Sequence, residues 1–257
     1  MKINFFKKLK KNINVYTVIN YKNYNINTND VFCLIYIKIM ESKYKFNELM
    51  KERHSTRKFQ KKQIPEDILK QIISTSLLSP SWCNSQPWNI YVASGNTIEE
   101  IRKIWISKNR EKIKGYSDIE PGHRTDFSER SQKVMDNLFK KVNEFDPSMK
   151  EFNEANVIMF NAPSVVYLTL PKGHTKYSIL DLGTLEMSIM LAAKDLGIDS
   201  IVAYELIKYP DVLRNSCKIP ENEDIIIGIA LGYEENDILN KFRANKLSLD
   251  EVCHFLK

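Results

Sequence analysis

A continuous apolar run in the C-terminal part of the chain constrains the fold more than any other feature. It reads Ile-Ile-Ile-Gly-Ile-Ala-Leu over residues 225–231. A run of this length without polar alternation indicates a strand that is buried on both faces. We therefore expect this segment to lie at the centre of a sheet.

Other segments alternate between strand and helix patterns. Strand patterns occupy residues 88–94, 164–170 and 198–204. Helical spacing of apolar residues predicts helices over residues 42–53, 65–79, 127–145, 179–196 and 210–217, and Thr97 to Glu100 has the sequence of a capping box that begins another helix. No repeat and no linker divides residues 40–257. We predict a single α+β or α/β sandwich domain over residues 40–257.

The helix predicted over residues 179–196 is the most apolar in the chain. Its apolar residues cover more than one face, so we expect burial on several sides. The core accounts for one side, and a partner subunit is the candidate for the other. Leu185 and Ile189 are the positions where we expect an introduced charge to break up such an assembly.

The formal net charge of +6 is confined to the N-terminal segment. Residues 1–29 contain six lysines and no acidic residue. Without them the chain has 38 − 6 = 32 basic and 32 acidic residues, so we expect no basic groove for nucleic acid in the folded part. A non-catalytic protein that binds nucleic acid through residues 1–29 is the remote alternative.

Residues 1–39 differ from the rest in composition and lack periodicity. Their apolar run at residues 31–37 is too short to span a bilayer, and a secretory signal would need a longer apolar region with a small-residue cleavage site. An organelle-targeting leader is an alternative, although the segment has no arginine. We expect a disordered or non-native extension, with Met40 as the true start.

The cysteines and glycines argue against several classes of site. Cys33, Cys83, Cys217 and Cys253 form no Cys-x-x-Cys pair, so a zinc site lacks support, and we expect reduced thiols and a cytoplasmic location. The glycines never form Gly-x-Gly-x-x-Gly or a P-loop. This argues against a dinucleotide-binding Rossmann unit and against NTP hydrolysis.

A polar loop, Ser-Pro-Ser-Trp-Cys-Asn-Ser-Gln-Pro-Trp over residues 79–88, separates a predicted helix from a predicted strand. Pro80 and Pro87 bracket it and push the residues before them out of the helical region. A stiff loop between buried elements can present amide and hydroxyl groups to a ligand. The alternative is a plain connector stiffened by proline.

A basic motif, Arg53-His54-Ser55-Thr56-Arg57-Lys58-Phe59, lies upstream of this loop. Its guanidinium and hydroxyl groups suit a phosphate, and a solvated basic turn is the alternative. Arg-x-Ser-x-Arg followed by Pro-Ser-x-x-Asn-x-Gln-Pro-Trp, in this order, closely resembles the FMN-dependent nitroreductase family.

The resemblance covers residues 45 to about 255 and includes Ala162-Pro163-Ser-Val-Val, the helix from Asp181 to Gly197, and Ile-Ala-Leu-Gly-Tyr233. In that family a central, mostly antiparallel sheet is flanked by helices, and two subunits intertwine to bury FMN at their interface. The resemblance implies an α+β fold built as an α/β/α sandwich, a homodimer, FMN as cofactor, and neither nucleic acid nor a membrane as partner.

The resemblance also implies which residues bind FMN. Arg53 and Ser55, with His54 between them, would hold the phosphate together with Lys246 or, as the alternate, Arg243. Arg57 would lie near flavin N1 and O2. The other subunit would contribute the loop residues Pro80, Ser81, Trp82 and Asn84, and the N5 edge would be lined by Tyr204, Glu205 and Leu206.

The implied mechanism is ping-pong. NAD(P)H gives hydride to flavin N5 and leaves, and a nitroaromatic or quinone then takes its place and is reduced. No side chain acts as nucleophile or base. Reductive dehalogenation and flavin fragmentation at the same flavin site are alternatives that depend on the charged loop or lid predicted over residues 109–126.

Trp82 departs from the small residue that is common at its position. In this it resembles a subgroup that acts on nitroaromatic acids and similar substrates. The tryptophan either narrows the site or stacks on a ring, and plain packing is the alternative.

Overall fold

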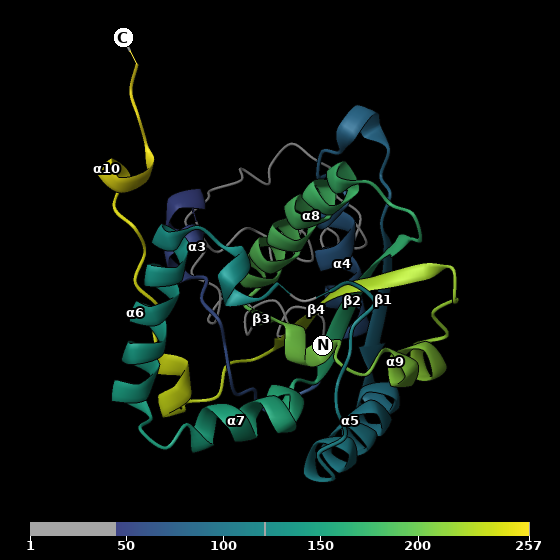
Figure 1. Ribbon diagram of the computed structural model, residues 1–257. Helices are drawn as coiled ribbons and strands as arrows, with labels where there is room; N and C mark the ends of the chain where they lie inside the picture. Colours follow the sequence, from purple (N-terminus) through teal and green to yellow (C-terminus); the bar gives the residue numbers. More distant parts are fainter. Residues whose placement is uncertain (1–44, 121, 257) are drawn as a thin grey trace, which may run out of the picture. The chain divides into compact units, whose positions relative to one another are not determined.

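The structure, a computed structural model, describes residues 45–120 and 122–256. The predicted extension at residues 1–39 lies outside these described residues (Figure 1). In the described part, no helix is both long enough and apolar enough to cross a membrane.

Within the described residues, four antiparallel strands form the sheet in the order β1-β2-β4-β3. They span Asn89–Ser94 (β1), Ser164–Pro171 (β2), Asp199–Ala203 (β3) and Glu223–Gly232 (β4). The interior position of β4 confirms the prediction from its apolar run. Ile225 and Ala230 pack into one core cluster and Ile226 and Ile229 into the other, so β4 is buried on both faces.

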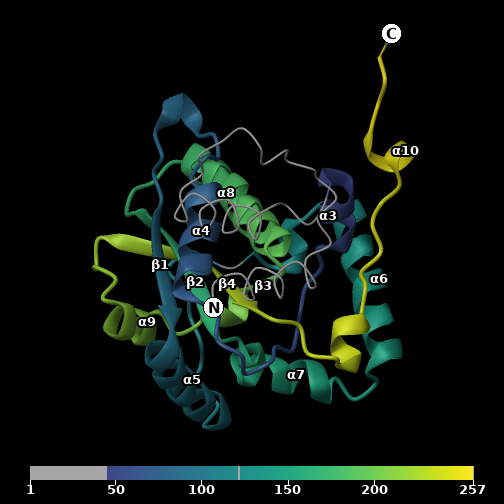
Figure 2. The same cartoon turned by 180° about the vertical axis from the view of Figure 1, so that it is seen from behind.

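Helices cover both faces of this sheet. One face carries α4 (Glu66–Ser76) and α8 (Lys176–Asp195), with α3 (Phe46–Glu52) beside α8, and the other carries α5 (Gly95–Arg110), α7 (Lys150–Val157) and α9 (Pro210–Cys217). In Figures 1 and 2, α4 and α8 lie above the strands and α5, α7 and α9 below them. The predicted α+β architecture, an antiparallel sheet flanked by helices, is confirmed.

Alternation along β2 shows how one strand contributes to both cores. Val165 and Tyr167 belong to the cluster on the α5 side, whereas Val166 and Leu168 belong to the cluster on the α8 side. All four are fully buried. Successive side chains of a strand point to opposite faces, so an entirely apolar strand requires cover on both sides.

The remaining elements lie outside the central layers. They are α6 (Glu129–Phe145), α10 (Leu249–Val252) and the short 3₁₀ turns η2 (Trp82–Asn84), η3 (Arg124–Asp126), η4 (Met159–Asn161), η5 (Tyr204–Leu206) and η6 (Ile238–Lys241). Ser128 caps α6 by accepting a hydrogen bond from the Ser131 amide.

Several helix bounds differ from the sequence prediction: α4 ends at Ser76 instead of residue 79, α6 begins at Glu129 instead of residue 127, and the starts of α5 and α8 also differ. α5 begins at Gly95 directly after β1, so the capping box predicted at Thr97 is wrong. Gly95 has a φ of 56°, a conformation that glycine adopts freely, and this lets the strand turn into a helix without a loop. α8 begins at Lys176 instead of Ile179, because the Thr175 hydroxyl accepts from the Ser178 amide (3.2 Å) and caps the helix earlier.

The interface expectation for α8 also needs correction. Leu185 and Ile189 are fully buried in the core of the chain itself, so neither can face a partner. A charge at either position would disrupt the subunit. The exposed side of α8 instead presents Tyr177 and Leu180, whose exposed fractions are 53% and 63%. The sequence showed that several faces are apolar but did not show which one meets the sheet.

Candidate functional site

The basic motif extends the β3 edge of the sheet. Ser55 forms a parallel bridge with Ser200 of β3, and the Thr56 amide donates to the Ser200 carbonyl oxygen (3.0 Å). Asn240 of η6 binds the next residue, because its amide oxygen accepts from the Arg57 backbone N–H (2.6 Å). The backbone of the motif is therefore fixed by two separate parts of the chain.

Arg53 places a cation at the start of this motif. Its Nε is shielded from solvent and has no hydrogen-bond acceptor among the described residues. The hydroxyl of Thr56 is likewise buried without a partner in the described part. Buried donors without acceptors are costly and rare. The local donor set therefore fits a ligand that supplies acceptor oxygens, as a phosphate does.

Arg57 is a second, more buried cation. Its guanidinium lies over the rings of Phe152 and Phe242, at 5.4 Å and 5.1 Å from their centroids, and Nη1 donates to the Ser55 carbonyl oxygen (3.0 Å). Burial, and then repulsion from Arg243, lower the pKa of Arg57 to about 10. The group is still charged at neutral pH. Two cations that repel each other favour an anion between or beside them.

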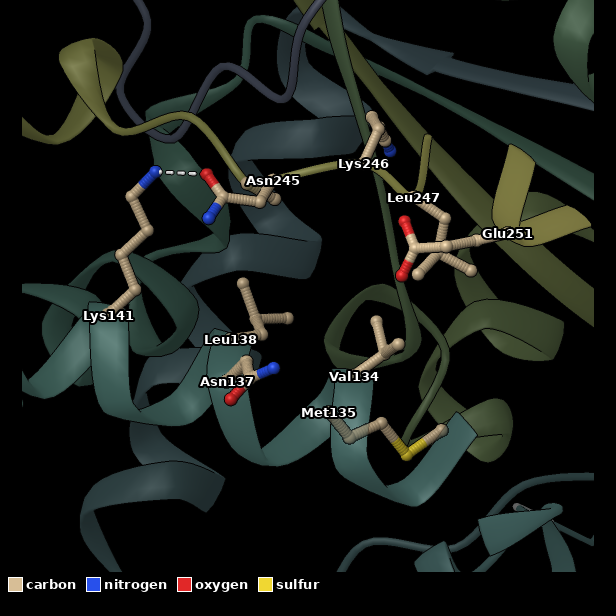
Figure 3. Close-up of a pocket in the computed structure, with 10 residues that line it drawn as sticks. Val134, Met135, Asn137, Leu138, Lys141, Asn245, Lys246, Leu247 and Glu251 are labelled. Atoms are coloured by element: carbon tan, nitrogen blue, oxygen red, sulfur yellow. Dashed lines mark hydrogen bonds between the residues drawn. The ribbon is translucent and has the colours of Figure 1, made fainter. Parts of the chain in front are cut away.

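The structure separates the two candidates for the C-terminal phosphate ligand. Arg243 lies close enough to Arg57 to lower the pKa of Arg57. Nη1 of Arg243 donates to the Asn240 carbonyl oxygen (2.6 Å). Lys246 instead lines a pocket of about 370 Å³ opposite Val134 and Leu138 of α6 (Figure 3). The sequence favoured Lys246 as the phosphate ligand and gave Arg243 as the alternate. In the structure Arg243 is the one of the two that lies near the basic motif.

The contacts of His54 argue against a role in binding an anion. Its Nδ1 lies 2.8 Å from the Glu52 carbonyl oxygen, and its Nε2 lies 3.3 Å from a carboxylate oxygen of Glu234. The imidazole therefore connects the motif to the segment after β4. A structural role for His54 fits these contacts better than contact with a phosphate.

The Pro-Ser loop is held by a buried carboxylate of α8. Both oxygens of Asp181 accept from the Trp82 backbone N–H (3.0 and 3.1 Å), and one also accepts from the Ser85 hydroxyl (3.4 Å). The Thr184 hydroxyl, one turn along α8, donates to the Pro80 carbonyl oxygen (3.2 Å). The loop is therefore an ordered feature fixed to α8.

Several loop residues adopt left-handed backbone conformations. Cys83, Asn84 and Gln86 have φ values of 47°, 58° and 43°. Gln86 precedes Pro87 and lies outside the right-handed helical region, as expected. The Ser81 hydroxyl accepts a hydrogen bond from the Gln86 backbone N–H (3.0 Å) and so closes the loop on itself. Non-glycine residues in this region store backbone strain, which is concentrated at functional sites.

The segment predicted to line the N5 edge forms η5. Tyr204 is 39% exposed and Glu205 forms an ion pair with Lys208, whereas Leu206 is fully buried. A Cβ on Gly228 would meet Leu206 Cβ at 2.7 Å, so the leucine side chain packs tightly on β4. Leu206 is buried as a whole residue, so Tyr204 and Glu205 are the members of this segment that a ligand can reach.

The charged loop after α5 is tied to the chain segment that follows η5. Over residues 111–119 the Tyr116 amide donates to the Lys208 carbonyl oxygen (2.9 Å), and the Ile113 carbonyl oxygen accepts from the Tyr209 hydroxyl (3.0 Å). The Asp118 carboxylate accepts from Arg214 (2.6 Å). The predicted loop is confirmed, but this part of it is anchored and is not a free lid.

Two positioning residues were not predicted from the sequence. Asp181 lies in the most apolar helix, and an acidic residue in the first turns of such a helix is a signal for a buried hydrogen-bond acceptor. Asn240 has no comparable signal, because it lies in a polar segment. Its side chain nevertheless makes four hydrogen bonds to backbone groups and is 2% exposed.

Comparison with known proteins shows which proteins this chain resembles. A solved structure of an FMN-dependent nitroreductase, NfnB from Mycobacterium smegmatis in complex with NADPH, superposes with a TM-score of 0.75 at 23% identity and covers 82% of this chain and 97% of that one. The 4-nitrobenzoate reductase of Pseudomonas putida is 24% identical over 217 residues, 82% of this chain and 95% of that protein. An iodotyrosine dehalogenase 1 homolog of Caenorhabditis elegans is 26% identical over 199 residues, 76% of this chain and 56% of that protein.

The family model described as the Nitroreductase family matches residues 50–233. This range includes the whole basic motif, the Pro-Ser loop, η5 and all four described strands. Because the family model matches more than half of the chain, the chain belongs to the Nitroreductase family.

Proposed function

We propose that the protein is an FMN-dependent oxidoreductase that takes electrons from NAD(P)H and reduces nitroaromatic or quinone-type acceptors. Two observations carry this proposal: Arg53 Nε is buried without an acceptor among the described residues, and Arg57 and Arg243 repel each other. These cations suit an anionic group such as a phosphate, in a chain that belongs to the Nitroreductase family.

The residues present fit FMN in chemical terms. Arg53, Ser55 and Arg243, with Lys246 as the other basic candidate, would hold the phosphate, and Arg57 would stabilise negative charge on the flavin ring. Bound FMN would supply the two-electron transfer between reductant and acceptor. The fixed Pro-Ser loop and the backbone of η5 would orient the ring, with Pro80, Ser81, Asn84, Tyr204 and Glu205 as the nearest candidates.

We also propose that the protein is a homodimer that binds FMN at the subunit interface. Large apolar side chains are exposed on the helical layer of α3, α4 and α8, among them Phe46 (67%), Leu78 (84%) and Leu180 (63%). The C-terminal segment exposes a second set, including Phe255 (76%) and Leu256 (93%). Exposed apolar surface of this extent supports contact with a second copy.

A cytoplasmic location is part of this proposal. Cys83, Cys217 and Cys253 are free thiols in the part of the chain that the structure describes. Unpaired cysteines and a soluble cofactor couple such as NAD(P)H and FMN both suit a reducing compartment. The proposal assigns the catalytic domain to residues 40–257 and no catalytic role to residues 1–39.

Reductive dehalogenation is the second candidate function. The similarity to an iodotyrosine dehalogenase homolog motivates it. The flavin site would be shared, and the residues around the acceptor would decide the chemistry. Turnover of nitrofurazone, menadione and a halotyrosine by the same preparation would separate the two functions.

The cofactor assignment is tested by the flavin content of the purified protein. We expect a yellow protein that releases FMN, and not FAD, on denaturation. Arg53→Ala should lose most of its flavin, because a charge-assisted contact to phosphate is worth about 1.5–3 kcal/mol. Arg110→Ala, at the end of α5, is the matched control and should retain FMN. Full flavin occupancy in Arg53→Ala would refute the phosphate site.

A further inference from the structure

Two stacked aromatic side chains lie exposed beside the Pro-Ser loop. Trp82 of η2 and Tyr177 of the first turn of α8 have ring centroids 4.6 Å apart with an interplanar angle of 34°. Trp82 is 58% exposed and Tyr177 53% exposed. Large aromatic rings usually bury most of their surface, so a stacked pair this exposed needs an explanation.

The pair is held rigidly from both sides. The Trp82 backbone N–H is bound by both oxygens of the buried Asp181 carboxylate, at 3.0 and 3.1 Å. Tyr177 lies between Thr175 and Ser178, which form the capping box of α8. Because the backbone at each ring is already fixed, a ligand that stacks on the pair would lose little affinity to ordering.

The surroundings favour a small planar ligand. The loop beside the rings places the polar residues Asn84 and Gln86 on the surface, and Lys176 adjoins Tyr177 in α8. Aromatic rings mixed with a few polar amide groups are typical of small-molecule sites. An electron-poor ring, such as a nitroarene, complements the electron-rich faces of indole and phenol.

We propose that Trp82 and Tyr177 form an aromatic subsite that binds the ring of the electron-accepting substrate and makes the enzyme selective for aromatic acceptors. This inference rests on the proposed function, in which the Pro-Ser loop borders a flavin. It resolves the two readings of Trp82 in favour of ring stacking. Tyr177, which the sequence motifs did not single out, becomes a specificity-determining residue.

The test compares an aromatic acceptor with one that has no ring. Values of kcat/KM are measured for nitrobenzene and for ferricyanide with wild-type holoenzyme, Tyr177→Leu and Tyr177→Phe. Loss of one aromatic contact should lower the nitrobenzene-to-ferricyanide ratio in Tyr177→Leu by about two- to tenfold, mainly through KM. Tyr177→Phe should retain the wild-type ratio. Phe139→Leu removes a 56% exposed ring from α6 and should also leave the ratio unchanged.

The remaining outcomes overturn the inference in distinguishable ways. Equal losses for both acceptors, or a ratio unchanged in Tyr177→Leu, would show that the pair does not select the ring. A Tyr177→Leu protein that becomes monomeric by light scattering would assign the pair to subunit contact. Wild-type protein that contains no flavin, or that fails to reduce nitrobenzene, would refute the proposed function itself together with this subsite.

Discussion

At the residue scale, Glu186 on α8 is a half-buried carboxylate. It forms no ion pair or hydrogen bond with any residue that the structure describes. Burial raises the pKa of Glu186 above its ordinary value of 4.5. The folded state therefore binds this proton more tightly than the unfolded state does. The stabilisation that this bound proton gives the folded state is fully present below the pKa of Glu186 in the unfolded chain. It is lost as the pH rises through the pKa of Glu186 in the folded chain.

Glu186→Gln tests this sign. The substitution removes the charge, so the variant should melt at a higher temperature than wild type at pH 7 or above. The difference should disappear below about pH 4, where the unfolded chain also holds the proton. For a domain of this size, about 1 kcal/mol corresponds to roughly 2–4 °C, and we expect a gain no larger than that.

Glu66→Gln on α4 is the matched control. Glu66 is exposed, and its hydrogen bond with Lys70, then the charge of Lys70, lower its pKa. Its removal should give no gain at neutral pH. If Glu186→Gln melted no higher than wild type at pH 7, Glu186 would have a partner outside the described residues or would not be desolvated.

Sequence motifs identified some site residues and missed others for a physical reason. Arg53 and Arg57 were identified because arginine and serine close together in a short motif are typical of anion binding. The grouping of Arg243 with Arg57 depends on how η6 packs, and neither spacing nor composition encodes that packing. The assignments of these residues to FMN stay predictions.

At the scale of elements, Lys208 joins η5 to the loop that follows α5. Its Nζ forms an ion pair with Glu205 and donates to the Asn109 amide oxygen (2.7 Å), and its side chain is 15% exposed. Gly115 allows this approach, because a Cβ there would lie 3.0 Å from the Lys208 Cβ and carbonyl oxygen. The Lys208 side chain thus couples η5 to the C-terminal end of α5, and its backbone carbonyl oxygen binds the loop beyond.

Lys208→Met should destabilise the fold measurably. It leaves the Glu205 carboxylate and the Asn109 carbonyl without their donor, at a cost of about 1–3 kcal/mol in unfolding free energy. Urea titration would measure the loss. Lys70→Met, which removes an ion pair whose side chains are 75% and 79% exposed, should leave the urea midpoint close to that of wild type. Equal losses of unfolding free energy at the two positions would show that the Lys208 contacts stabilise the fold no more than the exposed ion pair does.

Elements were predictable where one dominant signal acts, and not where a turn depends on tertiary contacts. β4 follows from its apolar run, and α9 has the bounds that its proline and spacing predicted. η2 and η4 contain left-handed residues, Cys83 and Phe160, that no propensity favours. Asp181 holds η2 in place through the Trp82 amide, so its shape depends on a residue far away in the sequence.

At the scale of the whole molecule, we predict that residues 1–39 are dispensable. They contribute all of the net charge and contain no core pattern. Protein that starts at Met40 should therefore match the full chain in melting temperature and in NAD(P)H-dependent reduction of menadione. A large fall in either quantity would show that the segment packs on the domain or takes part in the site.

The last prediction links assembly to cofactor retention. A ligand that binds only the dimer stabilises the dimer by mass action, so loss of the subunit contact should release FMN as well. Leu180 on α8 is 63% exposed, and a charge there should leave the subunit's own core intact. Leu180→Glu should therefore give a folded, colourless monomer. Light scattering measures the mass, and the flavin absorbance of the same fractions measures occupancy.

Ile104→Glu on α5 provides the control for this experiment. Ile104 is 42% exposed and lies on the opposite helical layer, so the same change should leave both mass and flavin content as in wild type. Leu185→Glu should instead unfold the subunit, because Leu185 is fully buried between α8 and the sheet. A wild-type monomer with a full complement of FMN would refute the shared site, because a single subunit would then suffice to hold the cofactor.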